Sequence, residues 1–399
     1  MDKIVIDGMN HTGDGISRLD GKVIFVSKTI SGDIVSIKDR VEYKNYAKAS
    51  IDTFIKKSED RVSVKCPYYD LCGGCQIMGL SYDKQLDYKR DKVINIFKRY
   101  GDMDINPSII SSKQYGYRNK IVLQVQDGEI GLFKSSSNDI VAIDRCLLVS
   151  DNINRIIGII KRDISVKLVN KIMIRESFYG VMVVFYGEVD ENEVISSLKD
   201  CVTSIYVNSD CIYGDDFIVD KLGSYKFAIS GEAFFQVNNG QTVKLYDKVL
   251  EYLGNDRNRV MDLYCGTGSI GIYASSKCNE VSGIEINESA VRNANMNKDI
   301  NDIKNISFKC GDVSSLISSD DKYDALIVDP PRSGLDKRTK RIIMDIGSDI
   351  IIYVSCNPIT LVRDINDLKD RYELRDITLV DMFPNTYHVE CVILLQRKD

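Results

Sequence analysis

The alternation of apolar and polar residues predicts short strands over the first part of the chain and a mixed region after it. Strands are expected at 3–7, 21–27, 33–37 and 46–54, separated by turns such as Gly13-Asp14-Gly15. Several short strands at this spacing are typical of a small β-barrel. A helix is predicted from about Asp83 to Tyr100, and Gly101 stands where a helix ends. Residues 113–235 have mostly a strand pattern, which predicts a central mixed α+β domain.

After Gln241 the pattern changes to alternating helices and strands. A helix at 243–253 leads to a strand at 259–263, a glycine loop, another helix and a strand at 280–285, and the alternation continues to the end. This order predicts a doubly wound parallel sheet of the Rossmann-like kind. The expected fold is therefore multidomain α/β, with domains at 1–57, 58–235 and 236–399.

Composition and charge limit the partners that are possible. The chain has 399 residues, 44% of them hydrophobic, and a net charge of −5. A chain of this length is expected to form two or three domains, and any nucleic-acid surface must be a local patch. One such patch is expected between Lys84 and Lys120, a stretch that contains nine Lys or Arg residues and only four Asp residues. The first seven residues lack the features of a signal peptide and no apolar run is long enough to span a membrane, so a cytoplasmic location is predicted.

A glycine loop indicates a nucleotide-type cofactor. Gly266-Thr267-Gly268-Ser269-Ile270-Gly271 follows one predicted strand, and Glu285 ends the next. Glycines allow a ligand to approach the backbone, and an acid at this place can bind ribose hydroxyls. The pattern fits a nicotinamide cofactor and S-adenosylmethionine equally well. Asp312 ends the third expected strand of this sheet.

Two further motifs follow later strands of the same sheet. Asp329-Pro330-Pro331-Arg332 follows the fourth strand and Ser355-Cys356-Asn357-Pro358 follows the strand at 350–354, so a thiol and an acid are expected at one edge. A thiolate that adds to C6 of uracil makes C5 reactive, after which a base must remove the C5 proton. Glu390 is the candidate base. Enzymes that methylate amino groups normally have an aromatic residue after the acid-Pro-Pro turn, where this chain has Arg332.

Four cysteines form a candidate metal site. Cys66, Cys72 and Cys75 have the spacing Cys-x5-Cys-x2-Cys, and Cys146 is a remote fourth. Four thiolates can hold zinc or a [4Fe–4S] cluster, and spacing alone leaves both open. Three cysteines in one loop with a distant fourth suit the iron–sulfur cluster somewhat better.

Five motifs carry a resemblance to a known family. They are Phe235-Gln236-Val237-Asn238, Asp262-Leu263-Tyr264-Cys265-Gly266-Thr267-Gly268, the Asp329 and Cys356 motifs, and His388-Val389-Glu390. In this order they resemble the bacterial RNA 5-methyluridine methyltransferases over essentially the whole chain. The resemblance implies S-adenosylmethionine as methyl donor, Cys356 as nucleophile and Glu390 as proton acceptor. It also implies that the cofactor and uracil site is lined by Gln236, Tyr264, Gly266, Gly268, Glu285, Asp312 and Asp329.

The accessory parts resemble the branch that acts on 23S ribosomal RNA. Residues 1–57 are similar to a TRAM domain, an OB-like RNA-binding barrel, and that branch carries a [4Fe–4S] cluster on four cysteines. A monomer that methylates uridine in 23S ribosomal RNA is therefore expected. The alternatives are a transfer-RNA uridine methyltransferase, a cytosine C5-methyltransferase and a non-catalytic ribosome-assembly factor. Replacement of Cys356 separates the last of these from the enzymes, because an assembly factor should tolerate it.

Overall fold

An eight-stranded sheet forms the centre of the carboxyl-terminal half in the computed structural model, which describes residues 2–231, 233–318 and 320–399. Its strand order is β19-β18-β17-β20-β21-β23-β22-β7. In chain order the strands are β7 (Ser108–Ile110), β17 (Arg257–Leu263), β18 (Cys278–Glu285), β19 (Ile306–Cys310), β20 (Ala325–Val328), β21 (Ile350–Ser355), β22 (Tyr372–Val380) and β23 (Glu390–Arg397). Strands β17 to β21 are parallel, whereas β23 is antiparallel to both of its neighbours. The predicted doubly wound sheet is confirmed.

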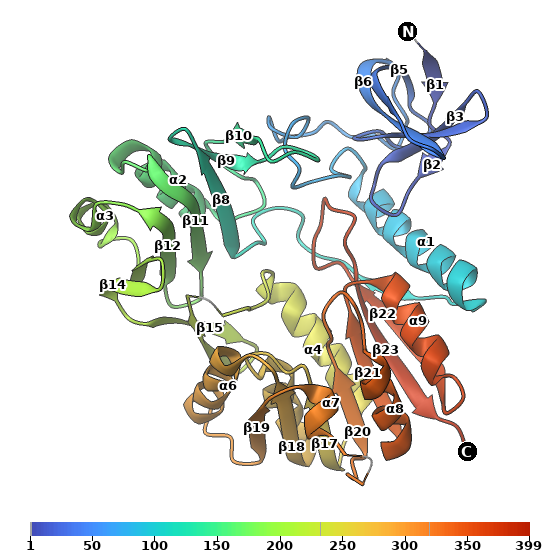
Figure 1. Ribbon diagram of the computed structural model, residues 1–399, viewed down its shortest axis with the longest axis vertical. Helices are drawn as coiled ribbons and strands as arrows, with labels where there is room; N and C mark the ends of the chain where they lie inside the picture. Colours follow the sequence, from blue (N-terminus) through green and yellow to red (C-terminus); the bar gives the residue numbers. More distant parts are fainter. Residues whose placement is uncertain (1, 232, 319) are drawn as a thin grey trace.

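Helices cover both faces of this sheet because successive residues of its strands point to opposite sides. Ile350 and Ile352 of β21 pack into one apolar cluster and Ile351 and Tyr353 into the other. The first cluster lies under α4 and α5 and the second under α8 and α9 (Figure 1). The helices of this half are α4 (Asn239–Leu253), α5 (Ser269–Ala274), η1 (Ser275–Lys277), α6 (Glu288–Ile300), α7 (Val313–Leu316), α8 (Lys337–Ile346) and α9 (Pro358–Leu368).

Segments from earlier in the chain complete this half of the molecule. Strand β7 pairs with β22 at the edge of the sheet, and α1 (Tyr82–Gly101) packs against α9. The hairpin of β15 (Phe217–Leu222) and β16 (Tyr225–Ser230) contributes Ile218 and Phe227 to the same apolar cluster as α4. The division into domains at 57 and 235 stays a prediction. These contacts join segments that precede residue 235 to elements that follow it.

A seven-stranded sheet forms the central part and lies beside α4 in Figure 1. Its order is β10-β9-β8-β11-β12-β13-β14, and α2 (Asp151–Asp163) and α3 (Glu191–Leu198) pack on it. Its strands are β8 (Lys120–Gln126), β9 (Glu129–Phe133), β10 (Ile140–Ala142), β11 (Leu168–Glu176), β12 (Val181–Glu188), β13 (Ser204–Val207) and β14 (Asp210–Gly214). The predicted central α+β region is therefore present.

Residues 3–56 form a separate six-stranded sheet above α1 (Figure 1). Its order is β1-β5-β6-β4-β3-β2, so β1 and β2 are its two edges and the described residues form no closed barrel. Its strands are β1 (Lys3–Val5), β2 (Gly8–Met9), β3 (Gly15–Leu19), β4 (Lys22–Val26), β5 (Ile34–Glu42) and β6 (Tyr46–Lys56). Within the described ranges, no helix has the length and apolar character needed to cross a bilayer.

Candidate active site

The glycine loop after β17 has a backbone that only glycine fits well. Gly268 has a φ of 76°, and a Cβ at this position would lie 2.5 Å from the ring of Phe308. Glu285, at the end of β18, accepts hydrogen bonds from the backbone N–H groups of Gly266 at 3.0 Å and Asn287 at 2.8 Å. The carboxylate is thereby fixed at the rim of the loop, and lone pairs remain for the hydroxyls of a ribose.

Two buried acids lie next to this loop. Burial and the proximity of Asp329 raise the pKa of Asp262 to about 8, and burial raises the pKa of Asp329 to about 7. The backbone N–H of Gly271 lowers the pKa of Asp262, in opposition to burial. A cationic ligand at this edge of the sheet would lower both pKa values and favour the charged carboxylates.

The remaining predicted cofactor residues differ in where they point. The ring of Tyr264 packs against the cluster under α8, and its pKa is raised by burial while Thr339 lowers it by a hydrogen bond. Asp312 is exposed and accepts hydrogen bonds from the hydroxyls of Ser314 and Ser315. Gln236 is half-buried, and its carbonyl accepts a hydrogen bond from Asn119. The roles of all three in cofactor binding stay predictions.

Cys356 and Glu390 face each other across two antiparallel strands. The last pair in the register of β21 and β23 is Ser355 with Cys391, and one further step places Cys356 opposite Glu390. Burial raises the pKa of Glu390 to about 8, and Asp329 raises it further. Burial and Glu390 also raise the pKa of the Cys356 thiol. The structure thus brings together Asp329, Cys356 and Glu390, three of the residues that the sequence singled out.

Arg332 completes this cluster. Its guanidinium lowers the pKa of both Cys356 and Glu390, in opposition to burial. In the sequence, Arg332 counts only against amino methylation, although its place directly after Asp329-Pro330-Pro331 is the signal that could have assigned it to the site. His388 packs against the rings of Phe383 and Tyr387, and burial lowers its pKa to about 4, so the imidazole is neutral at pH 7.

The segment 381–388, which leads into Glu390, is held by residues from other parts of the chain. Six of its carbonyl groups each accept a hydrogen bond from outside the segment. The donors are Gln76, Ile77, Lys89, Lys92, Tyr117, Asn238 and Gln241. Lys89 also forms a fully buried ion pair with Asp381. The start of β23, and with it Glu390, is therefore positioned by α1, the cysteine loop and the beginning of α4.

The four predicted cysteine ligands line one cavity of about 420 Å³. Lys28 donates to the carbonyl groups of Cys72, at 3.1 Å, and Cys75, and the N–H of Gly74 points to the sulfur of Cys72 at 3.3 Å. Burial raises the pKa of the Cys66 and Cys146 thiols. Within the described residues, no three His, Cys, Asp or Glu side chains are arranged as metal ligands. The iron–sulfur cluster and metal binding are therefore not established by this geometry.

Comparison with known proteins places the chain in a family. Residues 313–398 match the family model described as tRNA (Uracil-5-)-methyltransferase, and residues 255–349 match a methyltransferase domain. An RNA methyltransferase of Clostridium acetobutylicum is 33% identical over 446 residues, which cover 100% of this chain and 97% of the relative. One from Caldanaerobacter subterraneus subsp. tengcongensis is 35% identical over 443 residues, covering 99% and 98%. This chain belongs to the RNA uracil-5-methyltransferase family.

A solved structure of a uracil-5-methyltransferase has the same overall arrangement. The tRNA (uracil-54, C5)-methyltransferase of Pyrococcus abyssi, in complex with S-adenosyl-L-homocysteine, superposes with a TM-score of 0.82 at 29% identity. The match covers 99% of this chain and 100% of that one. The predicted class I methyltransferase fold and the predicted enzyme class are confirmed, whereas the 23S ribosomal RNA branch is not.

Proposed function

We propose that this uracil-5-methyltransferase transfers a methyl group from S-adenosylmethionine to C5 of a uridine in RNA through a covalent bond between Cys356 and C6. The observation that carries the proposal is the position of Cys356 opposite Glu390, with Asp329 and Arg332 beside them. A thiol and a carboxyl group at one sheet edge are the two groups that C5 methylation of uracil needs. A cytosine enzyme of the same chemistry is disfavoured by the family match.

In the first step the Cys356 thiolate adds to C6, which breaks the C5–C6 double bond and gives an enolate. Arg332 supports this step because its charge lowers the pKa of the thiol and favours the thiolate. Bound S-adenosylmethionine supplies an electrophilic methyl group. We assign its binding to the Gly266–Gly268 loop and Glu285, with Gln236, Tyr264 and Asp312 as further predicted contacts.

In the second step C5 of the enolate takes the methyl group, with S-adenosylhomocysteine as the leaving group, so that C5 carries both a methyl group and a proton. Glu390 accepts this proton, the C5–C6 double bond forms again, and the thiolate leaves C6. A carboxyl group with a pKa of about 8 holds the proton more tightly than an exposed glutamate does, which suits a proton acceptor at neutral pH. Uncharged His388, close by, does not compete for the proton because its pKa is about 4.

Two RNA classes are candidates for the substrate. The resemblance of residues 1–57 to a TRAM domain and the four cysteines favour 23S ribosomal RNA. The full-length similarity to an archaeal tRNA methyltransferase favours transfer RNA as the second candidate, because that enzyme matches the whole chain, accessory parts included. The monomeric state and the cytoplasmic location stay predictions.

We also propose that Cys66, Cys72, Cys75 and Cys146 hold a [4Fe–4S] cluster. All four thiols line one cavity, and Lys28 lies close enough for the thiolates to raise its pKa against the effect of burial. Four sulfur donors with no oxygen ligand suit iron–sulfur or zinc rather than a hard cation. Iron, sulfide and zinc analysis of protein purified without oxygen tests the assignment; zinc without sulfide would replace the cluster with a zinc site.

The experiment that tests the function is methyl transfer from labelled S-adenosylmethionine to unmodified 23S ribosomal RNA and, in parallel, to unmodified transfer RNA. Nucleoside analysis then identifies the product. Label in 5-methyluridine from ribosomal RNA supports the first substrate, and the same label from transfer RNA alone supports the second. Label only in 5-methylcytidine, or no transfer to either RNA, would contradict the proposed reaction.

A further inference from the structure

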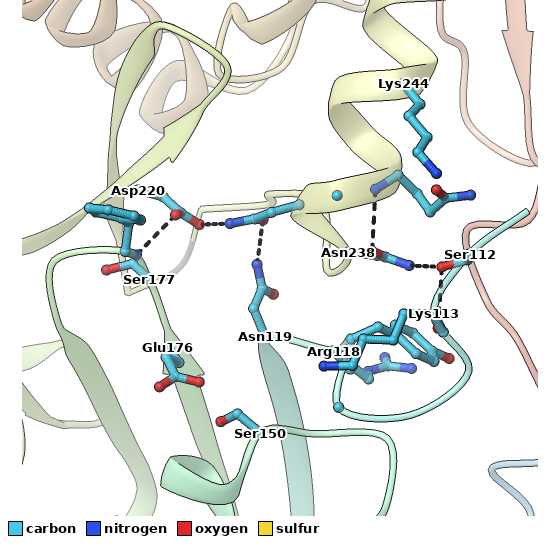
Figure 2. Close-up of a pocket in the computed structure, with 16 residues that line it drawn as sticks. Ser112, Lys113, Arg118, Asn119, Ser150, Glu176, Ser177, Asp220, Asn238 and Lys244 are labelled. Atoms are coloured by element: carbon cyan, nitrogen blue, oxygen red, sulfur yellow. Dashed lines mark hydrogen bonds between the residues drawn. The ribbon is translucent and has the colours of Figure 1, made fainter.

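A second pocket lies beside the candidate active site and shares none of the glycine-loop residues. It has a volume of about 460 Å³, within the range of ligand pockets. Its walls come from the loop at 112–119, the end of β11, strand β15 and the beginning of α4 (Figure 2). We call it the flanking pocket and define it by Lys113, Arg118, Asn119, Phe178, Asp220 and Lys244.

The cations of the flanking pocket are free to bind an anion. Figure 2 shows Lys244 on α4 and Lys113 and Arg118 on the loop below it. Lys244 donates to the carbonyl of Ser111 at 3.0 Å and Arg118 to that of Lys120 at 2.9 Å. In the parts of the chain that the structure describes, none of the three forms an ion pair with a carboxylate.

The two acids that line the flanking pocket, Asp220 and Glu176, accept hydrogen bonds from the protein. Asp220, on the opposite wall in Figure 2, accepts hydrogen bonds from the side chain of Asn239 at 2.8 Å and the backbone N–H of Phe178 at 3.0 Å. Glu176 accepts one from Asn152 at 2.9 Å. Asp220 is buried by these bonds, whereas Glu176 extends into the pocket in Figure 2. Lys113, Arg118 and Lys244 therefore give the pocket three positive charges against the one carboxylate of Glu176.

Aromatic side chains at the rim suit a nucleic-acid base. Phe178 lines the pocket and is 67% exposed, and the adjacent Tyr179 is 51% exposed, with 4.8 Å between their ring centroids. The backbone of Phe178 is bonded to Asp220, so its ring lies across the pocket from the three cations, and the ammonium of Lys221 lies 5.8 Å from the ring centroid. Exposed aromatic rings and cations in one pocket suit single-stranded RNA, because bases stack on the rings and phosphates bind the cations.

The flanking pocket is joined directly to the segment that carries Gln236. Asn119 in its wall donates from its side chain to the carbonyl of Gln236 at 3.2 Å and from its backbone to that of Val237 at 2.9 Å. Arg118 also lines the cysteine cavity, together with Phe234, which is 74% exposed. The pocket and the predicted cofactor and uracil contact Gln236 are therefore held together by two hydrogen bonds from one residue, Asn119.

We propose that the flanking pocket binds a nucleotide of the substrate RNA next to the target uridine, with its phosphate at Lys113, Arg118 and Lys244 and its base on Phe178. This proposal rests on the proposed function and adds to it the place where the RNA is held outside the reacting centre.

The test uses the full-length protein and a labelled single-stranded oligouridylate. The double substitution Lys113→Ala and Lys244→Ala should weaken binding roughly tenfold or more and lower the slope of log Kd against log salt by about 1.4, because two phosphate contacts are lost. The substitution Phe178→Ala should weaken binding by a further factor of about ten with little change in that slope. The matched control is Lys167→Ala with Lys199→Ala, two exposed lysines on the central part outside the pocket. An affinity and slope equal to those of the control pair would overturn the proposal.

Two further arms separate the possible explanations. Uridine monophosphate should compete only weakly with the labelled oligouridylate. If the free nucleotide competes as strongly as unlabelled oligouridylate does, the pocket is a mononucleotide site and the proposal is contradicted. Methyl transfer measured on the same proteins separates this proposal from the proposed function. If the wild type forms 5-methyluridine and the double variant binds RNA as tightly as the wild type, the proposal for the flanking pocket is contradicted and the proposed function stands. If the double variant binds RNA more weakly but the wild type forms no 5-methyluridine, the proposed function is contradicted and the RNA-binding pocket stands.

Discussion

The backbone N–H of Ile77 donates a hydrogen bond to the carbonyl of Asn385 at 3.1 Å. Ile77 lies two residues after Cys75, and Asn385 lies five residues before Glu390. Asn385 is fully buried and has a φ of 69°. Its side chain accepts a hydrogen bond from the side chain of Gln85 on α1 and donates one to the carbonyl of Gln114, and its backbone N–H donates to the side chain of Gln85. One residue therefore connects the cysteine loop, α1 and the segment that carries the candidate base.

Replacement of Asn385 should reduce activity by displacing Glu390. Asn385→Ala leaves buried hydrogen-bonding partners unpaired and places alanine at a positive φ. The free energy of unfolding should therefore be about 2–4 kcal/mol lower than in the wild type. Asn385→Gly is the matched variant, because it loses the same hydrogen bonds but tolerates the backbone angle. Thermal unfolding and kcat should both fall in the two variants, with the larger loss of stability in Asn385→Ala. A kcat equal to that of the wild type in Asn385→Gly would show that the link does not position the base.

Variants of Cys356 and Glu390 should block the reaction at different steps. Cys356→Ala should abolish methyl transfer, because no covalent bond to C6 can form. Glu390→Gln should still add and methylate but release product about 10²- to 10⁴-fold more slowly, since no group removes the C5 proton. Denaturing gel electrophoresis with labelled RNA should therefore show a persistent protein–RNA adduct for Glu390→Gln and none for Cys356→Ala. If both variants lacked the adduct, Glu390 would act before methylation.

The activity should rise with pH through the neutral range. The reactive forms of Cys356 and Glu390 are deprotonated, and burial raises the pKa of both groups, that of Glu390 to about 8. The value of kcat/KM should therefore increase through about pH 8, where Glu390 loses its proton, and continue to increase above it as the Cys356 thiol is deprotonated. Arg332→Gln should move the rising limb to higher pH, because Arg332 lowers both pKa values. A limb that moved to lower pH, or stayed in place, would contradict the role given to Arg332.

Gly268 should be required for cofactor binding through its lack of a side chain. A Cβ would meet the ring of Phe308 at 2.5 Å, so Gly268→Ala should displace the loop. Gly21 has the same φ, 76°, but nothing within 4 Å of an added Cβ, which makes Gly21→Ala the control for a side chain at this φ. Calorimetric titration with S-adenosylmethionine should show at least a tenfold weaker affinity for Gly268→Ala, about 1.4 kcal/mol, and little change for Gly21→Ala. Equal losses in the two variants would mean that strain, and not the contact with Phe308, sets the affinity.

The sequence by itself determined the sheet and the edge at which the chemistry gathers. Alternating helices and strands predict a parallel sheet, and motifs that follow its strands must meet at one edge because the carboxyl ends of parallel strands coincide there. Asp329, Cys356 and Glu285 could therefore be placed from local patterns alone.

Only the tertiary structure decided how distant segments complete that site. The apolar positions of α1 predict a buried face of Leu86, Val93, Ile94, Phe97 and Tyr100. Val93 and Phe97 are fully buried, but Tyr100 is exposed, and polar Gln85 and Lys89 are buried in addition. Gln85 and Lys89 are buried because the segment at 381–388 offers them carbonyl and carboxylate partners, and no pattern within one helix reveals a partner nearly 300 residues away. The same holds for Arg332 and for the flanking pocket, whose charges come from separate elements. Local periodicity fixes which residues share a face of one element, whereas hydrogen bonds and charges between elements depend on how those elements pack.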